Sequence, residues 1–311
     1  MNSYKIYIFL FIIALLLYFF GFYLYKRFIS NPKFVYKNNI GNNLISILRN
    51  YIKQLRKFET NIKLNIYNNK KINRLEVLKV YCSSIKDFTS SEQNRLKILT
   101  NEIINDVIEF PTLYHQFNWN FVKLDSDIEW GMPFTLGEYI FLPENIFNMN
   151  DIELKSTLLH EQIHVIQRKN QKKFNLMYTK FLGFKKINNC VKGEYLDKYR
   201  VSNPDGMDVN WIYKSGMHWI MPMLMMNPNN TNNIEEYGVY VNNKKGIYNV
   251  DLTGGGNEPV MLPLNKISEY RKDFKRSSGI YHPNEYLAHS IEDAVYKNSK
   301  HAKLLLKLFF N

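Results

Sequence analysis

Residues 157–166 read Thr157-Leu158-Leu159-His160-Glu161-Gln162-Ile163-His164-Val165-Ile166 and contain the pattern His-Glu-x-x-His. The apolar residues of this stretch recur with helical spacing, and residues four positions apart lie on one face of a helix. His160 and His164 can therefore bind a single zinc ion, while Glu161 reaches the water at that ion. Water activated in this way, with a carboxylate as general base, hydrolyses amide bonds. The motif predicts zinc-dependent hydrolysis of peptide bonds, with Glu161 as the catalytic residue.

The residues around the motif predict a long helix that suits a buried metal site. Asn150 is placed as the N-cap with Glu153 in the third helical position, and the apolar face continues to Arg168. Apart from Glu161, no residue between Thr157 and Ile166 is an acid, lysine or arginine. Burial of an unpaired charge is costly, so this composition is what a buried helix requires.

This helix-borne motif resembles that of the zincins, a superfamily of zinc-dependent metallopeptidases. The resemblance implies an α+β fold in which an edge strand before the motif helix binds extended peptide. Residues 134–142 lie between Pro133 and Pro143, are rich in aromatic and β-branched residues, and are expected to form that strand. An edge strand offers unpaired backbone groups that a substrate main chain can bind.

The third zinc ligand distinguishes the zincin subfamilies. Metzincins carry glycine and histidine at the positions where this sequence has Gln167 and Asn170. Gluzincins take a glutamate from a later helix, and the segment from Asn284 to Ala288 is similar to their Asn-Glu-x-x-Ala pattern. The resemblance implies Glu285 as the third ligand, beside His160 and His164, of one zinc ion.

Two features depart from the gluzincin pattern. His164 and Glu285 are 121 positions apart, more than in thermolysin-like enzymes. His289 stands where those enzymes carry an aspartate that supports a histidine ligand, and Glu292, one turn further on, is a candidate for that supporting role. Glu194 and His289 remain alternative third ligands, and an ordinary acid at a helix start remains the alternative reading of Glu285.

His218 and Tyr281 are candidates to stabilise the oxyanion of the tetrahedral intermediate. Zincins often use a histidine or a tyrosine to donate that hydrogen bond. A structural aromatic role is the alternative for both residues. The sequence does not choose between them.

An apolar run from Ile6 to Tyr25 predicts a transmembrane helix at the N-terminus. Its 20 uncharged residues would span about 30 Å as a helix, which matches the hydrocarbon core of a bilayer. The run is longer than the apolar region of a signal peptide and ends in large residues instead of a cleavage site. We therefore expect residues 1–25 to be an uncleaved single-pass anchor.

The net charge of +13 comes mainly from the segment after this run. Residues 26–80 hold 13 Lys or Arg against Glu59 and Glu76, whereas residues 81–311 are nearly neutral. The positive-inside bias then predicts that the rest of the chain lies on the cytoplasmic or topologically equivalent side. The basic segment also predicts contact with anionic lipids, with a solvated helix pair as the alternative. No nucleic-acid partner is expected.

Shorter patterns outline the rest of the chain. Apolar residues spaced three and four apart between positions 44 and 58 predict a helix, Ser90 is expected to cap another, and Pro283 to begin a last one. Residues 237–250 read as a hairpin. The glycosylation pattern at Asn229 would matter only outside the cytoplasm, and the three glycines at 254–256 read as a flexible loop. Cys82 and Cys190 show no metal-binding spacing.

We therefore predict an α+β fold, with a zincin-like metallopeptidase domain over residues 80–311, a basic juxtamembrane helical segment over residues 26–79 and one preceding transmembrane helix. The predicted function is that of a membrane-anchored zinc metalloprotease acting on protein or peptide substrates. Two other interpretations stay open. One is a catalytically inactive zincin-fold membrane protein that serves interaction or structure. The other is a lipid or nucleic-acid binder that works through residues 26–80, with the motif incidental.

Overall fold

The computed structural model describes residues 3–29, 31–64, 72–188, 190–191, 193–206, 210–227, 230–253, 258–297 and 299–310. Asn229 of the glycosylation pattern and the three glycines at 254–256 lie outside these residues.

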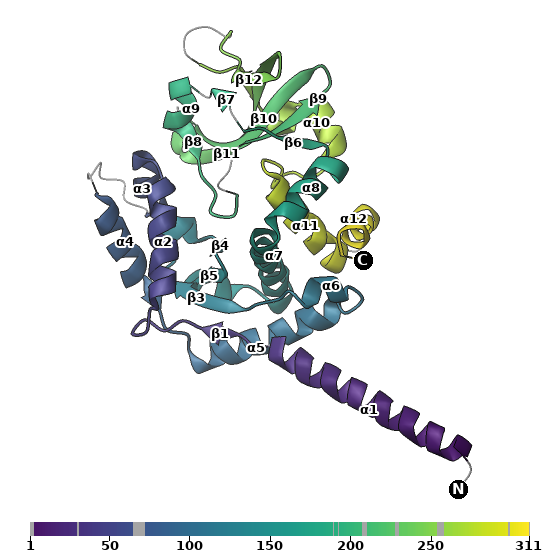
Figure 1. The fold of residues 1–311 in the computed structure, drawn as a ribbon. Helices are drawn as coiled ribbons and strands as arrows, with labels where there is room; N and C mark the ends of the chain where they lie inside the picture. Colours follow the sequence, from purple (N-terminus) through teal and green to yellow (C-terminus); the bar gives the residue numbers. More distant parts are fainter. Residues whose placement is uncertain are drawn as a thin grey trace.

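Helices and strands are interspersed along the chain, and the strands form two sheets. Figure 1 shows the two sheets at opposite ends of the body, with helix α7 between them. The α-helices are α1 (Ser3–Ile29), α2 (Asn42–Gln54), α3 (Lys57–Lys63), α4 (Arg74–Ser83), α5 (Ser90–Asp106), α6 (Pro111–Tyr114), α7 (Asp151–Lys169), α8 (Gln171–Phe181), α9 (Gly193–Tyr199), α10 (Ser268–Asp273), α11 (Pro283–Tyr296) and α12 (Lys300–Phe310). Short 3₁₀ helices are η1 (Ile128–Gly131), η2 (Glu144–Asn148) and η3 (Leu264–Lys266).

The first sheet is mixed and has the order β1-β3-β5-β4, with β2 also paired to β3. Strands β1, β3 and β5 are parallel, whereas β4 is antiparallel to β5 and lies at the edge. The bounds are β1 (Lys33–Phe34), β2 (Ile85–Lys86), β3 (Asn120–Leu124), β4 (Phe134–Leu136) and β5 (Tyr139–Pro143). Parallel strands need cover on both faces, and helices supply it here.

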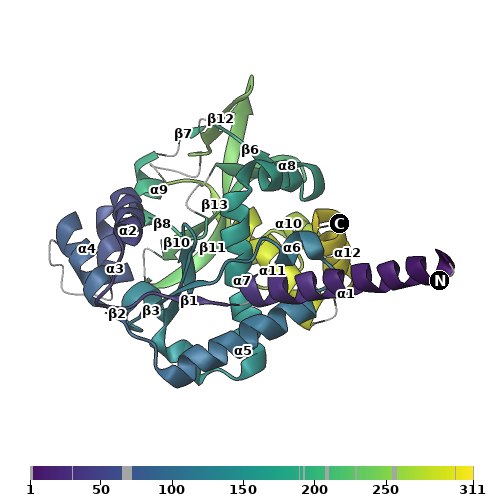
Figure 2. The same cartoon turned by 60° about the horizontal axis from the view of Figure 1, so that its bottom comes forward.

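Alternating side chains of β5 enter two different cores. Ile140 and Leu142 pack in one core with residues of α5 and α7, whereas Phe141, between them, packs in the other with residues of α2 and α4. This alternation is the two-residue period of a strand that is buried on both faces. Figure 2, in which α2 and α4 lie apart from α5 and α7, agrees with this layering.

The predicted single strand over residues 134–142 is instead a hairpin of β4 and β5. The two strands pair with Thr135 opposite Ile140. Gly137, in the turn, has a φ of +58°, a conformation that glycine adopts at little cost. A glycine at the first position of a two-residue turn is a known hairpin signal, and the pattern of apolar residues concealed it.

The second sheet is formed mainly by residues between α7 and α11, the long interval noted in the sequence. Its order is β6-β9-β10-β11-β12-β7, with β13 paired to β11 and β8 to β10. The bounds are β6 (Phe184–Lys186), β7 (Cys190–Val191), β8 (Arg200–Val201), β9 (Trp211–Ser215), β10 (His218–Asn227), β11 (Asn230–Lys244), β12 (Ile247–Val250) and β13 (Met261–Pro263). The hairpin predicted over residues 237–250 is confirmed by the pairing of β11 with β12.

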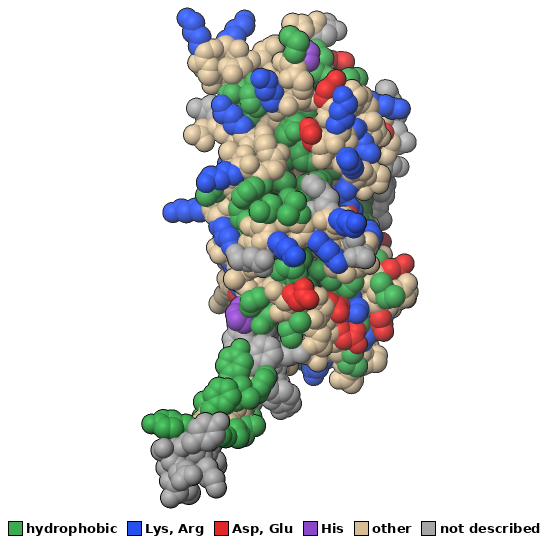
Figure 3. Space-filling view, turned by 90° about the vertical axis from the view of Figure 1, so that its right-hand side faces the viewer, with side chains coloured by type: hydrophobic (Ala, Val, Ile, Leu, Met, Phe, Trp, Pro, Cys, Tyr) green, Lys and Arg blue, Asp and Glu red, His purple; other side chains and the backbone are tan. Residues whose placement is uncertain are grey.

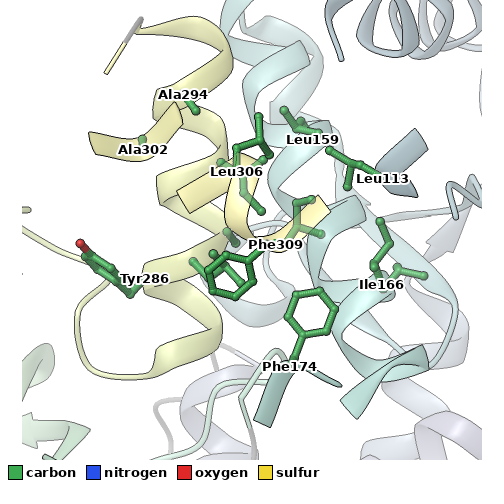
Figure 4. Close-up of a cluster of buried hydrophobic side chains, with 14 of the residues drawn as sticks. Leu113, Leu159, Ile166, Phe174, Tyr286, Ala294, Ala302, Leu306 and Phe309 are labelled. Carbon is green, nitrogen blue, oxygen red and sulfur yellow. The ribbon is translucent and has the colours of Figure 1, made fainter. Parts of the chain in front are cut away.

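Helix α7 forms as predicted and carries the motif through the centre of the molecule. The side chain of Asn150 accepts a hydrogen bond from the backbone N–H of Glu153 at 3.0 Å, which confirms the predicted cap. Leu159 and Ile166 pack with residues of α11 and α12, among them Leu306 and Phe309 (Figure 4). This apolar packing fixes α7 against α11, the second helix of the candidate site.

Of two predicted helix starts, the one at Pro283 is confirmed, whereas the cap predicted at Ser90 is wrong by one residue. Pro283 is the first residue of α11, as predicted, and His282 caps it by accepting from the backbone N–H of Asn284 at 3.1 Å. The cap of α5 is Thr89 rather than Ser90, because the side chain of Thr89 accepts from the N–H of Glu92 at 3.2 Å. The reciprocal pairing of Thr89 with Glu92 outweighs the pattern read from Ser90.

The predicted transmembrane anchor at Ile6 to Tyr25 is wrong, and so is the single-pass membrane localisation with an inward-facing catalytic domain. Helix α1 covers this run and extends away from the body (Figures 1 and 2). In the part of the chain that the structure describes, no helix has both the length and the apolar content that a bilayer crossing needs.

The fold class also needs correction. The structure is a mixed α/β fold, with a mixed parallel and antiparallel sheet between helices and a second sheet formed mainly of antiparallel pairs. The predicted α+β class preceded by a transmembrane helix does not describe it. Parallel pairing of β1, β3 and β5, which periodicity alone does not reveal, is the physical reason for the difference.

The basic segment packs on the domain. Apolar residues of α2 and α4 share a core with strands of the first sheet. Two of the basic side chains are paired internally, because Lys63 contacts Glu129 at 2.6 Å and Arg56 contacts Glu59 at 2.8 Å. On the face seen in Figure 3, Lys and Arg side chains are spread over the body of the protein.

Candidate active site

Helices α7 and α11 bring three potential ligand residues together. Nε2 of His160 lies 3.0 Å from Nε2 of His164. One carboxylate oxygen of Glu285 lies 3.4 Å from Nε2 of His160, and the other lies 3.4 Å from Nε2 of His164. The histidines come from one face of α7, and Glu285 comes from the first turn of α11.

The two 3.4 Å distances to Glu285 match the spacing of ligand atoms around one zinc ion, and the 3.0 Å between the two histidine nitrogens is shorter than that spacing. Ligand atoms about 2.0–2.2 Å from a tetrahedral zinc ion lie about 3.3–3.6 Å from one another. His164 and Glu285 are buried and the side chain of His160 is 12% exposed, so the two ring nitrogens and the carboxylate also need a proton or a cation between them. A carboxylate oxygen of Glu161, Oε2, is buried with no hydrogen-bond partner among the described residues. The donor set of His160, His164 and Glu285 therefore fits zinc, with Glu161 beside it.

The pKa values of the cluster reflect an excess of negative charge. Burial would lower the pKa of His160, but the nearby carboxylates of Glu285 and Glu292 outweigh it and raise the pKa to about 10. Burial and the carboxylate of Asp205 raise the pKa of Glu161 to about 8. Burial would also raise the pKa of Glu285, but the neighbouring histidines hold it well below its usual value. The cluster attracts a positive charge to the point where the three ligand atoms meet.

His164 is oriented by a hydrogen-bond partner on its other ring nitrogen. Nδ1 of His164 donates to Oε1 of Gln167 at 2.8 Å, and the Gln167 amide donates to the carbonyl of Asn284 at 3.0 Å. This chain leaves Nε2 of His164 as the free lone pair. Gln167 thus links α7 to the start of α11, next to Glu285.

Glu292 lies where the supporting carboxylate was predicted. Its carboxylate is 3.5 Å from Nδ1 of His160 and 3.0 Å from Nδ1 of His289, and it accepts from the hydroxyl of Ser156 at 2.6 Å. Burial would raise the pKa of Glu292, but these partners lower it, so the group is ionised near His160. Carboxylates in this position orient metal-binding histidines in many proteins.

Of the other candidate residues, His289 lies close to the cluster, whereas Glu194 and His218 do not. Glu194 is exposed on α9 and does not line the cavity described below, whereas His289 does. The ring centroid of His289 lies 4.3 Å from that of His160, so His289 remains close enough to serve as a ligand. His218 is exposed on β10, and its ring contacts Tyr240 rather than the cluster.

Sequence reasoning missed Asn203 and Asp205, which were read only as turn residues. Their loop follows β8 and enters the space between the two sheets. The amide of Asn203 donates to a carboxylate oxygen of Glu285 at 3.0 Å and to the hydroxyl oxygen of Tyr281. Asp205 lies near both His164 and Glu285. An Asn-Pro-Asp-Gly turn is common in loops, so the sequence carried no sign of this position.

The edge of β4, predicted to bind substrate main chain, is already bonded at Thr135. The backbone N–H of Thr135 donates to Asp205 at 2.9 Å, and its carbonyl accepts from Arg168 at 2.8 Å. Arg168 also donates to the carbonyl of Pro204 at 2.9 Å. A peptide that paired with Thr135 would have to displace Asp205 and Arg168. The loop from residue 202 to 206 therefore covers this edge.

A cavity of about 670 Å³ opens beside the cluster. It is lined by His160, Glu161 and Glu285 together with apolar side chains from both sheets, including Phe134 and Leu224. Its size is in the range of cavities that bind small molecules or short peptide segments. Tyr281 also lines it, so this candidate oxyanion donor lies at the site.

Comparison with known proteins identifies no relative of this chain. No protein-family model, no curated protein sequence and no solved structure matches it.

Glu285→Ala is expected to weaken zinc binding by more than the ~10–100-fold that loss of an outer partner causes, because a direct ligand is removed. Glu194→Ala, on the exposed helix α9, is the matched control and should leave zinc affinity unchanged. Competition with a chromophoric chelator measures both affinities. If Glu285→Ala retained its affinity while Glu194→Ala lost it, the third ligand would have to be sought elsewhere.

Proposed function

We propose that this protein is a zinc-dependent peptidase that hydrolyses peptide bonds in protein or peptide substrates. One observation carries the proposal: Nε2 of His160 and Nε2 of His164 lie 3.0 Å apart, and each lies 3.4 Å from one carboxylate oxygen of Glu285, beside a cavity that Glu161 also lines. The resemblance of the motif and of the Asn284 to Ala288 segment to gluzincins supports the same reaction.

His160, His164 and Glu285 would hold the ion. When bound, zinc supplies a Lewis acid that lowers the pKa of water at the site and polarises the substrate carbonyl. The chain contributes the orientation of the ligands through Gln167 and Glu292. The site needs no redox chemistry and no second substrate apart from water.

Glu161 is proposed to be the general base and then the general acid. It takes a proton from the water whose oxygen attacks the carbonyl carbon, and it returns a proton to the nitrogen as the C–N bond breaks. The products are a carboxylate and an amine. Its burial, with 4% of its surface exposed, keeps its carboxylate poorly solvated and hence more basic.

Tyr281 is proposed to stabilise the negative charge that develops on the carbonyl oxygen. Since Asn203 donates to the phenolic oxygen, the O–H of Tyr281 remains able to donate to substrate. Burial and the nearby Glu285 raise the pKa of Tyr281 well above its usual value, so the hydroxyl keeps its proton. A preorganised donor of this kind contributes roughly 10²–10³-fold to acyl transfer.

Removal and return of zinc test the proposal. The full-length protein, incubated with a broad peptide library, is expected to release fragments with new amino termini. A chelator should stop this release, and stoichiometric zinc should restore it. Mass spectrometry of the library identifies the cleaved bonds. Retention of zinc without any cleavage across the library would refute the peptidase and favour an inactive zinc-binding interaction protein.

A further inference from the structure

A strained turn in η1 borders the cavity. Glu129, Trp130 and Gly131 have φ values of +49°, +57° and +66°. Glutamate and tryptophan rarely adopt such values, and in the described part of the chain Lys245 is the only other non-glycine residue that does. Strain of this kind persists where the surroundings enforce it, and it is concentrated at binding sites.

A buried polar cluster enforces the strained turn. The Glu129 carboxylate accepts from the hydroxyls of Tyr51 and Tyr81 at 2.6 Å and 2.5 Å, and from Nζ of Lys63 at 2.6 Å. Lys63 is fully buried, and its ammonium lies 4.8 Å from the ring centroid of Trp130. This cluster of Glu129, Tyr51, Tyr81 and Lys63 therefore holds both the backbone of the turn and the orientation of the Trp130 ring.

The strained turn places apolar side chains in the wall of the cavity, and these side chains are partly exposed to solvent. Trp130 keeps 40% of its surface exposed, Met132 keeps 62%, and Met149 keeps 37%. All three line the same cavity as His160 and Glu161. Exposed large apolar residues at a concave site bind apolar groups of a ligand.

The backbone groups of Thr135 on β4 are already hydrogen-bonded, so a bound peptide would be recognised mainly through its side chains. Resting on the proposed function, we propose that Trp130 is a specificity-determining residue that selects peptides with a bulky apolar side chain near the cleaved bond. Main-chain pairing gives affinity with little dependence on sequence, whereas a pocket for a side chain gives specificity. Lys63 and Glu129 are positioning residues that act through Trp130.

Peptide binding tests the inference without hydrolysis. The probes are a short Ser/Gly peptide with a single Phe and the same peptide with Ala in its place, titrated calorimetrically into zinc-loaded Glu161→Gln protein. The Phe peptide is expected to bind about tenfold tighter or more, the gain for burying a large apolar side chain. Trp130→Ala should bring the ratio of affinities close to 1, and Trp130→Phe should restore most of it.

Trp219→Ala is the matched control, because Trp219 lies on β10 and does not line the cavity. It should keep the preference for Phe. An unchanged ratio in Trp130→Ala, no preference in the Trp130 protein, or no binding of either peptide would each overturn the inference. A preference that depends on Trp130 in a protein that cleaves nothing would uphold the subsite and refute only the peptidase. Circular dichroism of each variant verifies that it is folded.

Discussion

Glu161→Gln is expected to lower the rate of peptide hydrolysis by at least ~10²–10⁴-fold while zinc stays bound. Glutamine keeps the shape of the side chain but cannot take a proton from water. Oε2 of Glu161 has no hydrogen-bond partner among the described residues, so the substitution breaks no bond to this atom. Cleavage of the peptides found in the library screen, at matched zinc content, measures the effect.

The exposed Glu194 provides the control for this substitution. Glu194→Gln makes the same chemical change outside the cavity and should leave the rate unchanged. Two results would count against a catalytic Glu161: equal rates for Glu161→Gln and the parent protein, or a loss of zinc from Glu161→Gln that alone accounts for its lower rate.

His164→Ala is expected to remove stoichiometric zinc from the protein. His164 is 1% exposed, and its Nε2 lies within 3.4 Å of the two other ligand atoms. Elemental analysis after dialysis should find one zinc per chain in the parent protein and essentially none in the variant. The increase in melting temperature that zinc produces by binding the folded state should disappear as well.

His218→Ala serves as the control, since His218 is exposed on β10 and away from the cluster. It should keep both the zinc and the zinc-dependent increase in melting temperature. Loss of His164 also leaves the side-chain oxygen of Gln167 without its partner, which costs about 1–3 kcal/mol. Melting temperatures without zinc separate this cost from the loss of the metal. Full zinc occupancy in His164→Ala would contradict the site.

The local elements were predictable because local interactions set them. The Asn150 cap, the hairpin of β11 with β12 and the start of α11 at Pro283 each depend on residues a few positions apart. Errors arose where a local pattern had two readings. Gly137 was read as part of a strand although it turns the chain, and the apolar run from Ile6 was read as a membrane span.

Long-range pairing accounts for what could not be predicted. The basic segment appeared to be separate because its charge is conspicuous, yet its apolar residues complete one face of the first sheet. Lys63 shows the difference most clearly: in the sequence it is one more basic residue, and in the structure it is buried against Glu129, 66 positions away. Hydropathy and charge do not reveal such a partner.

The arrangement of His160, Glu161 and His164 follows from the sequence, because a spacing of four residues on a helix places both histidines on one face with Glu161 beside them. The positions of Glu285, of Glu292 near His160, and of the loop with Asn203 and Asp205 do not follow from it. These contacts join segments tens of residues or more apart, and their distances are set by the packing of α7 against α11 and of the second sheet on these helices.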